Sequence, residues 1–230
     1  LIQCAGYMRM YHHKYLELLS ETCREFNIHL IADEIAVGFG RTGTMFGFQQ
    51  AKITPDIICL SKGITGGYMT LSTILTTDDI YDAFYDEYEK LNAFLHSHSY
   101  TANPIACSAA NATLDIFKDK NVIKKNKILS AHMKKCFESL KDHPHVSDVR
   151  QKGMVLAIEL IKDKKRKISY NWKERRGIRA YLHGLKNNVL MRPLGNVIYF
   201  MPPYVITKKE ISFVSEIMKE GVDEATKKNS

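Results

Sequence analysis

Two short apolar runs decide the fold: Leu30-Ile31-Ala32-Asp33 and Ile57-Ile58-Cys59-Leu60-Ser61-Lys62. Each run ends in one ionisable residue, Asp33 or Lys62, and glycines or polar residues follow soon afterwards. Apolar runs of this length between turn signals are typical of strands buried on both faces, so we expect two neighbouring parallel strands in an α/β sheet. Ligands of such sheets bind beyond the carboxyl ends of the strands, which is where Asp33 and Lys62 would lie.

An acid and an amine at one sheet edge suit the chemistry of pyridoxal phosphate. A carboxylate beside the pyridine nitrogen favours its protonated form, and an amine forms a reversible imine with the aldehyde. We therefore expect Lys62 to be the imine-forming residue and the proton carrier, and Asp33 to hold the pyridinium. The structural alternative makes Asp33 a helix N-cap and Lys62 a surface lysine. Composition and spacing alone favour this structural alternative.

Three segments resemble the signature of the class III, ornithine-type, aminotransferases, a family that uses pyridoxal phosphate. The segments are Asp33–Gly43 (DEIAVGFGRTG), Pro55–Ile57 (PDI) and Ser61–Gly67 (SKGITGG). The resemblance extends over nearly the whole chain. It implies a fold-type I α/β architecture, with a mostly parallel sheet in a large domain and a smaller α+β carboxyl-terminal domain. It also implies that Asp33, Ile35 and Lys62 bind the cofactor and that Asp33 and Lys62 act in catalysis.

The expected division of the chain is residues 1–119, the later part of the large domain, and residues 120–230, a linker helix with the small domain. A chain of 230 residues with 45% hydrophobic residues can bury a sizeable core. The family places a phosphate-binding turn and an aromatic residue that stacks on the cofactor ring ahead of the position that Leu1 occupies here. The resemblance therefore implies a carboxyl-terminal portion of an enzyme, with part of the site outside it.

Apolar periodicity and capping residues predict the other elements. Helices are expected over residues 11–27, 45–51, 78–84, 104–117, 122–140, 172–185 and 207–225, and strands over residues 71–75, 146–149, 153–160, 189–191 and 196–201. Asp78 or Asp79 should cap the third of these helices, and Thr207 the last. The glycine loop after Asp33 contains Arg41, which we expect to pair with an acid.

Arg192 is the expected substrate-binding residue. It follows an apolar strand and precedes Pro193-Leu194-Gly195, a rigid turn that would orient its guanidinium for two parallel hydrogen bonds to a carboxylate. In the family an arginine at this position binds the substrate carboxylate, whereas the structural alternative is a surface or salt-bridge arginine. Tyr199 is expected near the amino donor, and a core aromatic residue is the alternative there.

The segment Arg192–Tyr204 is similar to one that is typical of the family members that act in biotin biosynthesis. This similarity implies S-adenosylmethionine as the amino donor and 8-amino-7-oxononanoate as the acceptor, with 7,8-diaminononanoate as the product. Lysine as the donor stays open, because some relatives use it. The nearest alternative is another class III ω-aminotransferase, with 2-oxoglutarate or pyruvate as the acceptor.

The segment His96-Ser97-His98-Ser99-Tyr100 corresponds to a family loop that crosses the interface of a homodimer and binds the partner's cofactor phosphate. Ser99 takes the place of the family's hydroxyl residue, and hydroxyl and backbone N–H groups serve a phosphate well. His98 replaces a proline and either adds charge or fills space, and Ser97 replaces a glycine on the substrate side. Two histidines also suit a metal, but no third ligand of suitable spacing is nearby, so no metal site is expected.

Charge narrows the range of partners. The net charge of +8 and the pI near 9.1 come from basic residues spread along the chain, with one dense run at Lys162–Lys167. We expect that run to be a solvated loop, and a basic surface to gather anionic substrate. We expect no nucleic-acid partner, although a basic nucleic-acid-binding module without catalysis is the remote alternative.

Cysteine usage indicates the compartment. The five cysteines are Cys4, Cys23, Cys59, Cys107 and Cys136. They are widely separated and include no C-x-x-C pair, which indicates reduced and mostly buried thiols in the cytoplasm. No apolar run approaches the length of a membrane span, so no membrane partner is expected.

Overall fold

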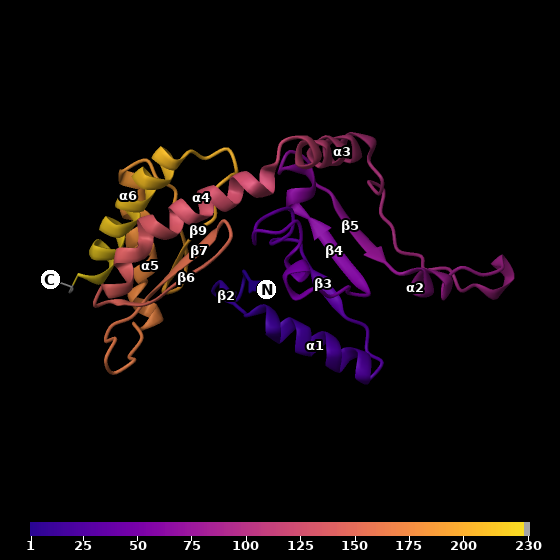
Figure 1. The fold of residues 1–230 in the computed structure, drawn as a ribbon, viewed down its shortest axis with the longest axis horizontal. Coiled ribbons are helices and arrows are strands. Elements are labelled where there is room, and N and C mark those ends of the chain that lie inside the picture. The colour runs from indigo at the N-terminus through magenta and orange to yellow at the C-terminus, as the bar shows by residue number, and fades with distance from the viewer. Residues whose placement is uncertain (228–230) are drawn as a thin grey trace. The chain divides into compact units, whose positions relative to one another are not determined.

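A computed structural model describes residues 1–227, which form two compact units (Figure 1). The first unit comprises Leu1 with residues 11–39 and 44–121, and the second comprises residues 2–10, 40–43 and those from Val122 onward. The main boundary between the units thus falls between Asn121 and Val122. Two early segments, residues 2–10 and 40–43, belong to the second unit. Each unit has its own hydrophobic cluster.

The first unit is built on a three-stranded sheet of order β3-β4-β5. Its strands are β3 (Ile31–Asp33), β4 (Ile57–Ser61) and β5 (Ser72–Thr76). β3 and β4 run parallel, as the sequence predicts, and β5 is antiparallel to β4. The other elements of this unit are α1 (His13–Glu25), η1 (Gly47–Ala51), η2 (Lys62–Thr65), α2 (Asp78–Asp82), η3 (Tyr88–Lys90) and α3 (Pro104–Asp119).

The prediction that β3 and β4 are buried on both faces is wrong within the described chain. Ile31 in β3 is 58% exposed, and most residues of β4 are only partly buried. One small cluster packs in this unit, formed by Phe39, Leu60, Ile64 and Ala110. The Phe39 ring lies edge-on to the ring of Phe46, with 5.6 Å between the ring centres. Apolar and β-branched residues favour the strand conformation, but burial depends on which elements pack against the sheet.

The second unit is built on a four-stranded antiparallel sheet of order β6-β7-β9-β8. Its strands are β6 (Val146–Lys152), β7 (Val155–Leu160), β8 (Arg192–Leu194) and β9 (Val197–Phe200), and a two-stranded sheet joins β1 (Ile2–Gln3) to β2 (Arg9–Met10). Its helical elements are α4 (Val122–Phe137), η4 (Glu138–Asp142), η5 (Trp172–Glu174), α5 (Arg176–Lys186) and α6 (Lys208–Thr226).

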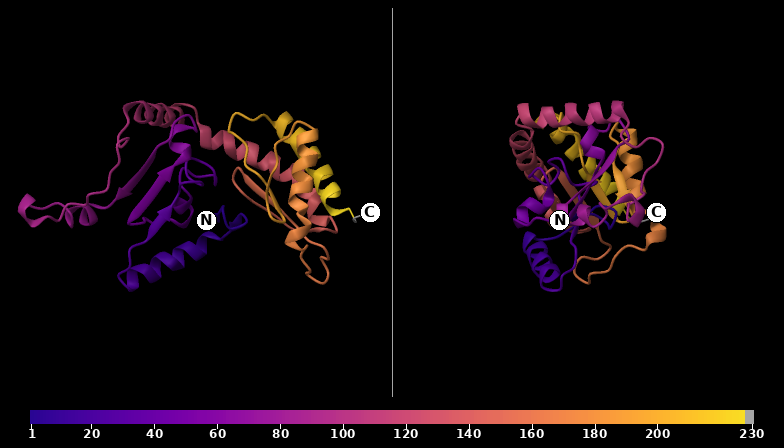
Figure 2. Two further views of the ribbon diagram at one scale, coloured as in Figure 1. Left: turned by 180° about the vertical axis from the view of Figure 1, so that it is seen from behind. Right: turned by 90° about the vertical axis from the view of Figure 1, so that its right-hand side faces the viewer.

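The helices α4, α5 and α6 gather on one side of this sheet, as Figure 2 shows. The central strand β7 is buried from Val155 to Ile158, so its neighbours cover it on both faces. Phe137 and Met133 of α4 are completely buried and fill the space between helix and sheet. Burial of such side chains stabilises the fold by roughly 1.5–3 kcal/mol each, which makes this core the stable centre of the second unit.

The β8–β9 hairpin differs from the predicted one. Pro193 and Leu194 lie within β8, and the turn falls at Gly195 and Asn196, not at Pro193-Leu194-Gly195. Gly195 has a φ of +59°, which an L side chain adopts only with strain. The predicted strand over residues 189–191 is wrong, because its buried apolar residues pack in the core without pairing in the sheet.

Two predicted helices begin or form differently. Residues 172–174 form the separate turn η5, and α5 begins only at Arg176, because Arg175 takes a left-handed φ of +49°. Residues 47–51 form a 3-10 turn where an α-helix over 45–51 was expected. In both cases local turn geometry interrupts an apolar period that is typical of a continuous helix.

The structure defines the N-terminal cap residues of α2 and α6. Thr77, whose backbone is extended, is the cap residue of α2, so the prediction of Asp78 or Asp79 is wrong. The cap prediction for α6 is confirmed: Glu210 N–H donates to Thr207 Oγ1, while the Glu210 carboxylate accepts from the Thr207 N–H. This reciprocal pair is a capping box, which satisfies two backbone donors that a helix start leaves free.

The sequence predicts the exposed basic loop correctly but not the burial of the cysteines. The basic run Lys162–Lys167 lies in a largely exposed loop, as predicted. All five cysteines are free but only partly buried, so the prediction of mostly buried thiols is wrong. Among residues 1–227, no helix is both long and apolar enough to cross a bilayer.

Candidate active site

Asp33 and Lys62 lie at the same edge of the first unit's sheet. In the parallel register of β3 and β4, Asp33 is opposite Cys59, and Lys62 directly follows the last residue of β4. Both side chains are exposed. The structure therefore brings an acid and an amine to the carboxyl ends of adjacent parallel strands, where open α/β sheets bind their ligands.

A local turn orients the Asp33 carboxylate. Its Oδ1 accepts a hydrogen bond of 3.0 Å from the backbone N–H of Ile35. The residues after β3 form turns and not a helix, so the alternative of Asp33 as a helix N-cap is wrong. The turn occupies one carboxylate oxygen and leaves Oδ2 without a hydrogen bond among the described residues.

Lys62 has an unusual backbone and an unpaired amine. Its φ is +46°, in the left-handed region, where a residue with a side chain carries strain of roughly 1–3 kcal/mol. Within residues 1–227 its amine forms no hydrogen bond and no ion pair. Strained residues of this kind concentrate at functional sites, since the surrounding structure must hold them in place.

Gly63 allows that backbone to pack. A Cβ built on Gly63 would meet the Phe39 side chain at 2.9 to 3.2 Å. Phe39 belongs to the cluster of the first unit and itself has a positive φ of +54°. The aromatic ring of Phe39 therefore supports the turn η2 at Gly63, and only glycine leaves room for this contact.

Glu34 is a buried acid beside Asp33 that the sequence analysis did not single out. Its side chain is 3% exposed, and its Oε1 accepts a 3.0 Å hydrogen bond from the N–H of Phe48. Burial raises the pKa of the Glu34 carboxyl, although backbone hydrogen bonds from Gly47 and Phe48 oppose the rise. Glu34 thus ties the start of η1 to the end of β3. The signal available in the sequence was the adjacent pair Asp33-Glu34, which cannot tell the exposed acid from the buried one.

Arg41 pairs with no acid among the described residues, so that prediction is wrong. Its Nη1 donates to the Pro202 carbonyl at 2.5 Å, and its guanidinium lies 4.4 Å from the centre of the Tyr204 ring. Burial lowers the pKa of Arg41 and raises the pKa of the Tyr204 phenol to about 12, with Arg41 opposing the latter rise. A carbonyl and an aromatic face satisfy a buried guanidinium without a counter-ion. All three residues belong to the second unit.

Arg192 and Tyr199 are cross-strand neighbours in the second unit. They are directly opposite each other in the β8–β9 register, so their side chains leave the sheet on the same face. Arg192 is exposed and has no ion pair among the described residues, whereas Tyr199 is half-buried. The salt-bridge alternative for Arg192 therefore has no partner within residues 1–227, whereas its exposure agrees with the alternative of a surface arginine.

Ser97, His98 and Ser99 lie in a long exposed segment of the first unit, in which every residue from 81 to 102 is exposed. The ring Nδ1 of His98 accepts a 3.1 Å hydrogen bond from the backbone N–H of Tyr100, and the backbone N–H of His98 donates to Thr101 Oγ1 at 3.0 Å. These bonds close one local turn and do not connect it to Asp33 or Lys62. Within residues 1–227 there is no group of three or more His, Cys, Asp or Glu that could hold a metal ion.

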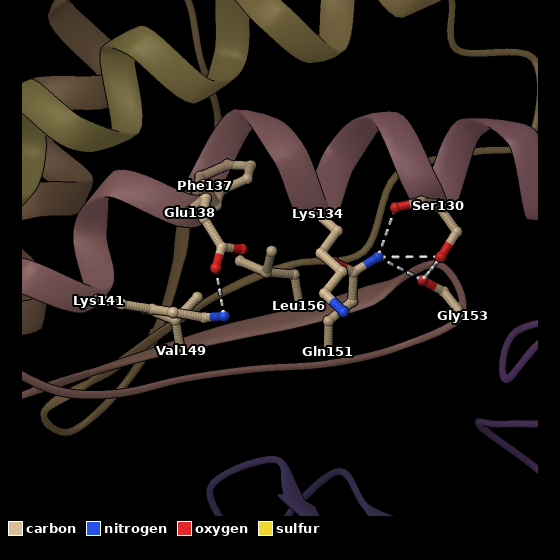
Figure 3. A pocket seen from close by; sticks show the side chains of 9 residues that line it. All are labelled: Ser130, Lys134, Phe137, Glu138, Lys141, Val149, Gln151, Gly153 and Leu156. Atoms are coloured by element: carbon tan, nitrogen blue, oxygen red, sulfur yellow. Dashed lines mark hydrogen bonds and ion pairs between the residues drawn. The ribbon is translucent and has the colours of Figure 1, made fainter.

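A separate pocket of about 330 Å³ opens in the second unit between α4 and the β6–β7 hairpin (Figure 3). Phe137, Val149 and Leu156 form its apolar part. At its polar end Gln151 Nε2 donates to the carbonyl of Ser130 at 2.8 Å. None of the site residues predicted from the sequence lines this pocket.

Comparison with known proteins decides the family. The profile of the aminotransferase class-III family matches residues 1–222. The chain belongs to this family. The matched range includes Asp33, Lys62 and the glycines that flank them.

Curated class-III relatives are similar over nearly the whole chain. It is 48% identical over 231 residues to the adenosylmethionine-8-amino-7-oxononanoate aminotransferase of Helicobacter pylori, covering 99% of this chain and 51% of that protein. It is 43% identical to the protein of the same name from Geobacter sulfurreducens, covering 98% of this chain and 50% of that protein. The chain thus spans about half the length of the curated relatives it matches.

Solved class-III structures share the fold. The aminotransferase of the same name from Methanocaldococcus jannaschii superposes with a TM-score of 0.87 at 42% identity, over 91% of this chain and 49% of that one. The omega transaminase from Pseudomonas jessenii, solved in complex with PMP, superposes with a TM-score of 0.91 at 28% identity, over 96% and 49%. The fold-type I α/β class expected from the sequence is confirmed.

Proposed function

We propose that this chain is part of an aminotransferase of biotin biosynthesis that moves an amino group from S-adenosylmethionine to 8-amino-7-oxononanoate, giving 7,8-diaminononanoate. The observation that carries the proposal is the pairing of an exposed amine, Lys62, with an exposed carboxylate, Asp33, at adjacent parallel strand ends. The names of the relatives at 43% and 48% identity supply the substrates.

The cofactor of the proposed reaction is pyridoxal 5'-phosphate. The donor set fits, since Lys62 offers an unpaired amine and Asp33 a carboxylate with one oxygen free of hydrogen bonds in the described chain. When bound, pyridoxal phosphate supplies an electron sink for the charge left at the substrate's α-carbon. Ile35 is proposed to line the cofactor site beside Asp33. His98 and Ser99 are proposed to contact a cofactor phosphate.

Asp33 and Lys62 divide the proton chemistry. Asp33 keeps a proton on the pyridine nitrogen, and its orientation is maintained by the N–H of Ile35. Lys62 would hold the cofactor through its Nζ, and the same Nζ would carry the proton between the substrate's α-carbon and the cofactor carbon. The strained backbone of Lys62 sets the direction of its side chain before substrate binds.

Arg192 and Tyr199 are proposed to recognise substrate. The guanidinium of Arg192 provides two parallel donors, which suit the carboxylate of the oxo-acid acceptor. Tyr199, opposite Arg192 in the hairpin, offers an aromatic face and a hydroxyl to the donor. Ser97 is proposed to contribute a hydroxyl to the substrate side.

The assembly and compartment of the proposed enzyme are those expected of the family. We propose a cytoplasmic homodimer in which the Ser99 segment reaches the cofactor phosphate of the partner subunit. The exposure of every residue from 81 to 102 supports a segment that is available to another chain. Sedimentation equilibrium of the full-length protein would return a monomer mass if this proposal were wrong.

Borohydride trapping and a donor panel test the function. Full-length protein treated with borohydride should gain the mass of reduced cofactor on the peptide of Lys62, and Lys62→Ala should abolish the adduct. S-Adenosylmethionine should then support amination of 8-amino-7-oxononanoate, with parallel lines in double-reciprocal plots because both substrates use one site in turn. Converging lines, or an adduct elsewhere, would overturn the proposal.

The second candidate is an ω-aminotransferase that uses 2-oxoglutarate or pyruvate as the acceptor. This candidate is supported by the structural similarity to the omega transaminase from Pseudomonas jessenii, which has a TM-score of 0.91. The same donor panel separates the two, because turnover of an ω-amine with pyruvate and none with S-adenosylmethionine would select the second candidate.

A further inference from the structure

Three polar side chains converge in the second unit, apart from every residue proposed for transamination. His132 Nε2 lies 2.9 Å from Ser212 Oγ and 3.5 Å from Cys136 Sγ, and the same Sγ lies 3.7 Å from Ser212 Oγ. We propose that Cys136 is a reactive thiol, with His132 as its base, and that low-molecular-weight disulfides modify it. A thiol beside an imidazole is the arrangement that activates nucleophilic cysteines in general.

The helix geometry sets this arrangement. His132 and Cys136 are four residues apart on α4, so their side chains lie one above the other on the same helix face. Ser212 comes from α6, which packs against α4. Two rigid helices therefore hold the base and the nucleophile within reach of each other, and no loop has to move.

The groups around His132 Nε2 can accept a hydrogen bond from it. The carbonyl of Lys208 lies 3.1 Å from His132 Nε2 and also accepts from Ser212 Oγ at 3.1 Å. A proton on Nε2 can be donated to one of these neighbours, the Lys208 carbonyl or the Ser212 oxygen, while the Cys136 sulfur stays at 3.5 Å. Transfer of the thiol proton to His132 consequently produces an ion pair that is hydrogen-bonded on the imidazole side.

Charged residues flank the cluster on both helices. The charged residues within one helical turn of the cluster on α4, η4 and α6 are Lys134, Lys135, Glu138, Lys208, Lys209, Glu210 and Glu216. The glutamates are engaged elsewhere, Glu138 with Lys141, Glu210 with Thr207 and Glu216 with Lys219. The four lysines have no ion pairs among the described residues, and Lys134 points away from the cluster into the pocket between α4 and the β6–β7 hairpin (Figure 3).

The cluster lies partly at the surface of the second unit. Cys136 and His132 are both partly exposed, although Cys136 also packs against the core of the unit. Modification of Cys136 therefore needs a disulfide small enough to reach a partly buried residue at the surface of the unit. Cys23 in α1 is partly exposed too, but its sulfur has no hydrogen-bond partner in the described chain. It is the matched comparison for Cys136.

The proposed reaction needs no further oxidant. The Cys136 proton passes to His132 Nε2, and the thiolate attacks one sulfur of the disulfide R–S–S–R. A new Cys136–S–R bond forms as the R–S–S–R bond breaks, and the departing RS⁻ takes the proton from His132. Cys136 and one R–S group end in a mixed disulfide, while the other R–S group leaves as the thiol.

The test measures the reaction of the full-length protein with oxidised glutathione and with 5,5'-dithiobis(2-nitrobenzoic acid), with peptide mass spectrometry to assign each cysteine. At pH 6.5 Cys136 should react at least about tenfold faster than Cys23, because an ordinary thiol is almost fully protonated there. His132→Gln should slow Cys136 about fivefold or more and leave Cys23 unchanged. Ser212→Ala should have a smaller effect in the same direction.

Two results would overturn the proposal: equal rates for Cys136 and Cys23 in the wild-type protein, or an unchanged Cys136 rate in His132→Gln. If all cysteines of His132→Gln react faster together, that variant has unfolded, and the pH dependence of the wild-type protein decides. A Cys136 rate that is nearly constant between pH 6.5 and 8 supports the proposal. A rate that climbs about tenfold per pH unit, as for an ordinary thiol, overturns it.

Discussion

Replacing Gly153 by alanine should loosen the docking of the Gly40–Gly43 segment within the second unit. Gly153 connects β6 to β7 with a φ of +58°, and a Cβ there would lie 2.3 Å from the Arg41 carbonyl oxygen and 2.5 Å from the carbonyl carbon of Thr42. Real Cβ atoms do not approach backbone this closely, so the segment must move. The 2.8 Å hydrogen bond from Met154 N–H to the Arg41 carbonyl would then be lost or weakened.

The magnitude follows from the separate contributions. A left-handed alanine costs roughly 1–2 kcal/mol, and the lost backbone hydrogen bond costs about 0.5–1.5 kcal/mol. Together they amount to about 1.5–3.5 kcal/mol, and relief of the backbone clash adds to this cost. At about 2–4 °C per kcal/mol for a domain of this size, the melting temperature should fall by roughly 3–14 °C.

Gly66→Ala is the matched control. Gly66 has nearly the same φ, +62°, but its Cβ would meet nothing closer than 3.6 Å, which is an ordinary contact. Gly66→Ala should therefore lower the free energy of unfolding only by the backbone strain, roughly 1–2 kcal/mol. Circular dichroism melts of the two full-length variants compare them directly. Equal losses for both variants would refute the steric reasoning.

Three further outcomes are expected. Burial raises the pKa of Glu34, so the stability it contributes is present below its ordinary pKa of 4.5 and is lost as the pH rises through its higher folded value. Urea unfolding of wild type against Glu34→Gln should show this loss with rising pH, and the opposite slope would contradict it. Arg192→Lys should raise the KM for the oxo-acid acceptor by about tenfold or more through loss of the two-donor fork, leaving cofactor trapping on Lys62 intact. An unchanged KM would remove Arg192 from the substrate site. Thr207→Ala should cost about 1 kcal/mol of unfolding free energy, measured in urea, because it breaks the capping box with Glu210.

Lys209→Ala is the control for the cap experiment. Lys209 is exposed on α6, two residues after Thr207, and takes no part in the capping box. Its replacement should therefore change the free energy of unfolding by no more than about 0.5 kcal/mol. A loss in Thr207→Ala as small as that of the control would show that the capping box contributes little to stability.

Local chemistry made part of the structure predictable. The parallel strands that end at Asp33 and Lys62 follow from two apolar runs between turn signals, and the α6 cap follows from the spacing of Thr207 and Glu210. The exposed loop at Lys162–Lys167 follows from charge alone. Each of these depends on residues a few positions apart, whose preferences act before any distant contact forms.

Distant contacts were not predictable in the same way. Arg41 meets the carbonyl of Pro202, which is 161 positions away, where the sequence suggested a nearby acid. Glu34 and Asp33 are adjacent, yet one is buried and the other exposed. Partner choice and burial of this kind depend on how whole elements pack, which neighbouring residues do not encode.

The sequence by itself determined the family, the strand-end pair of Asp33 and Lys62, and the main helix and strand types. Only the tertiary structure decided that Arg192 stands opposite Tyr199, and that His132 and Cys136 on α4 meet Ser212 of α6. The physical reason is that hydrogen-bond partners and burial depend on distances in space, and packing brings together residues 76 and 80 positions apart in the chain.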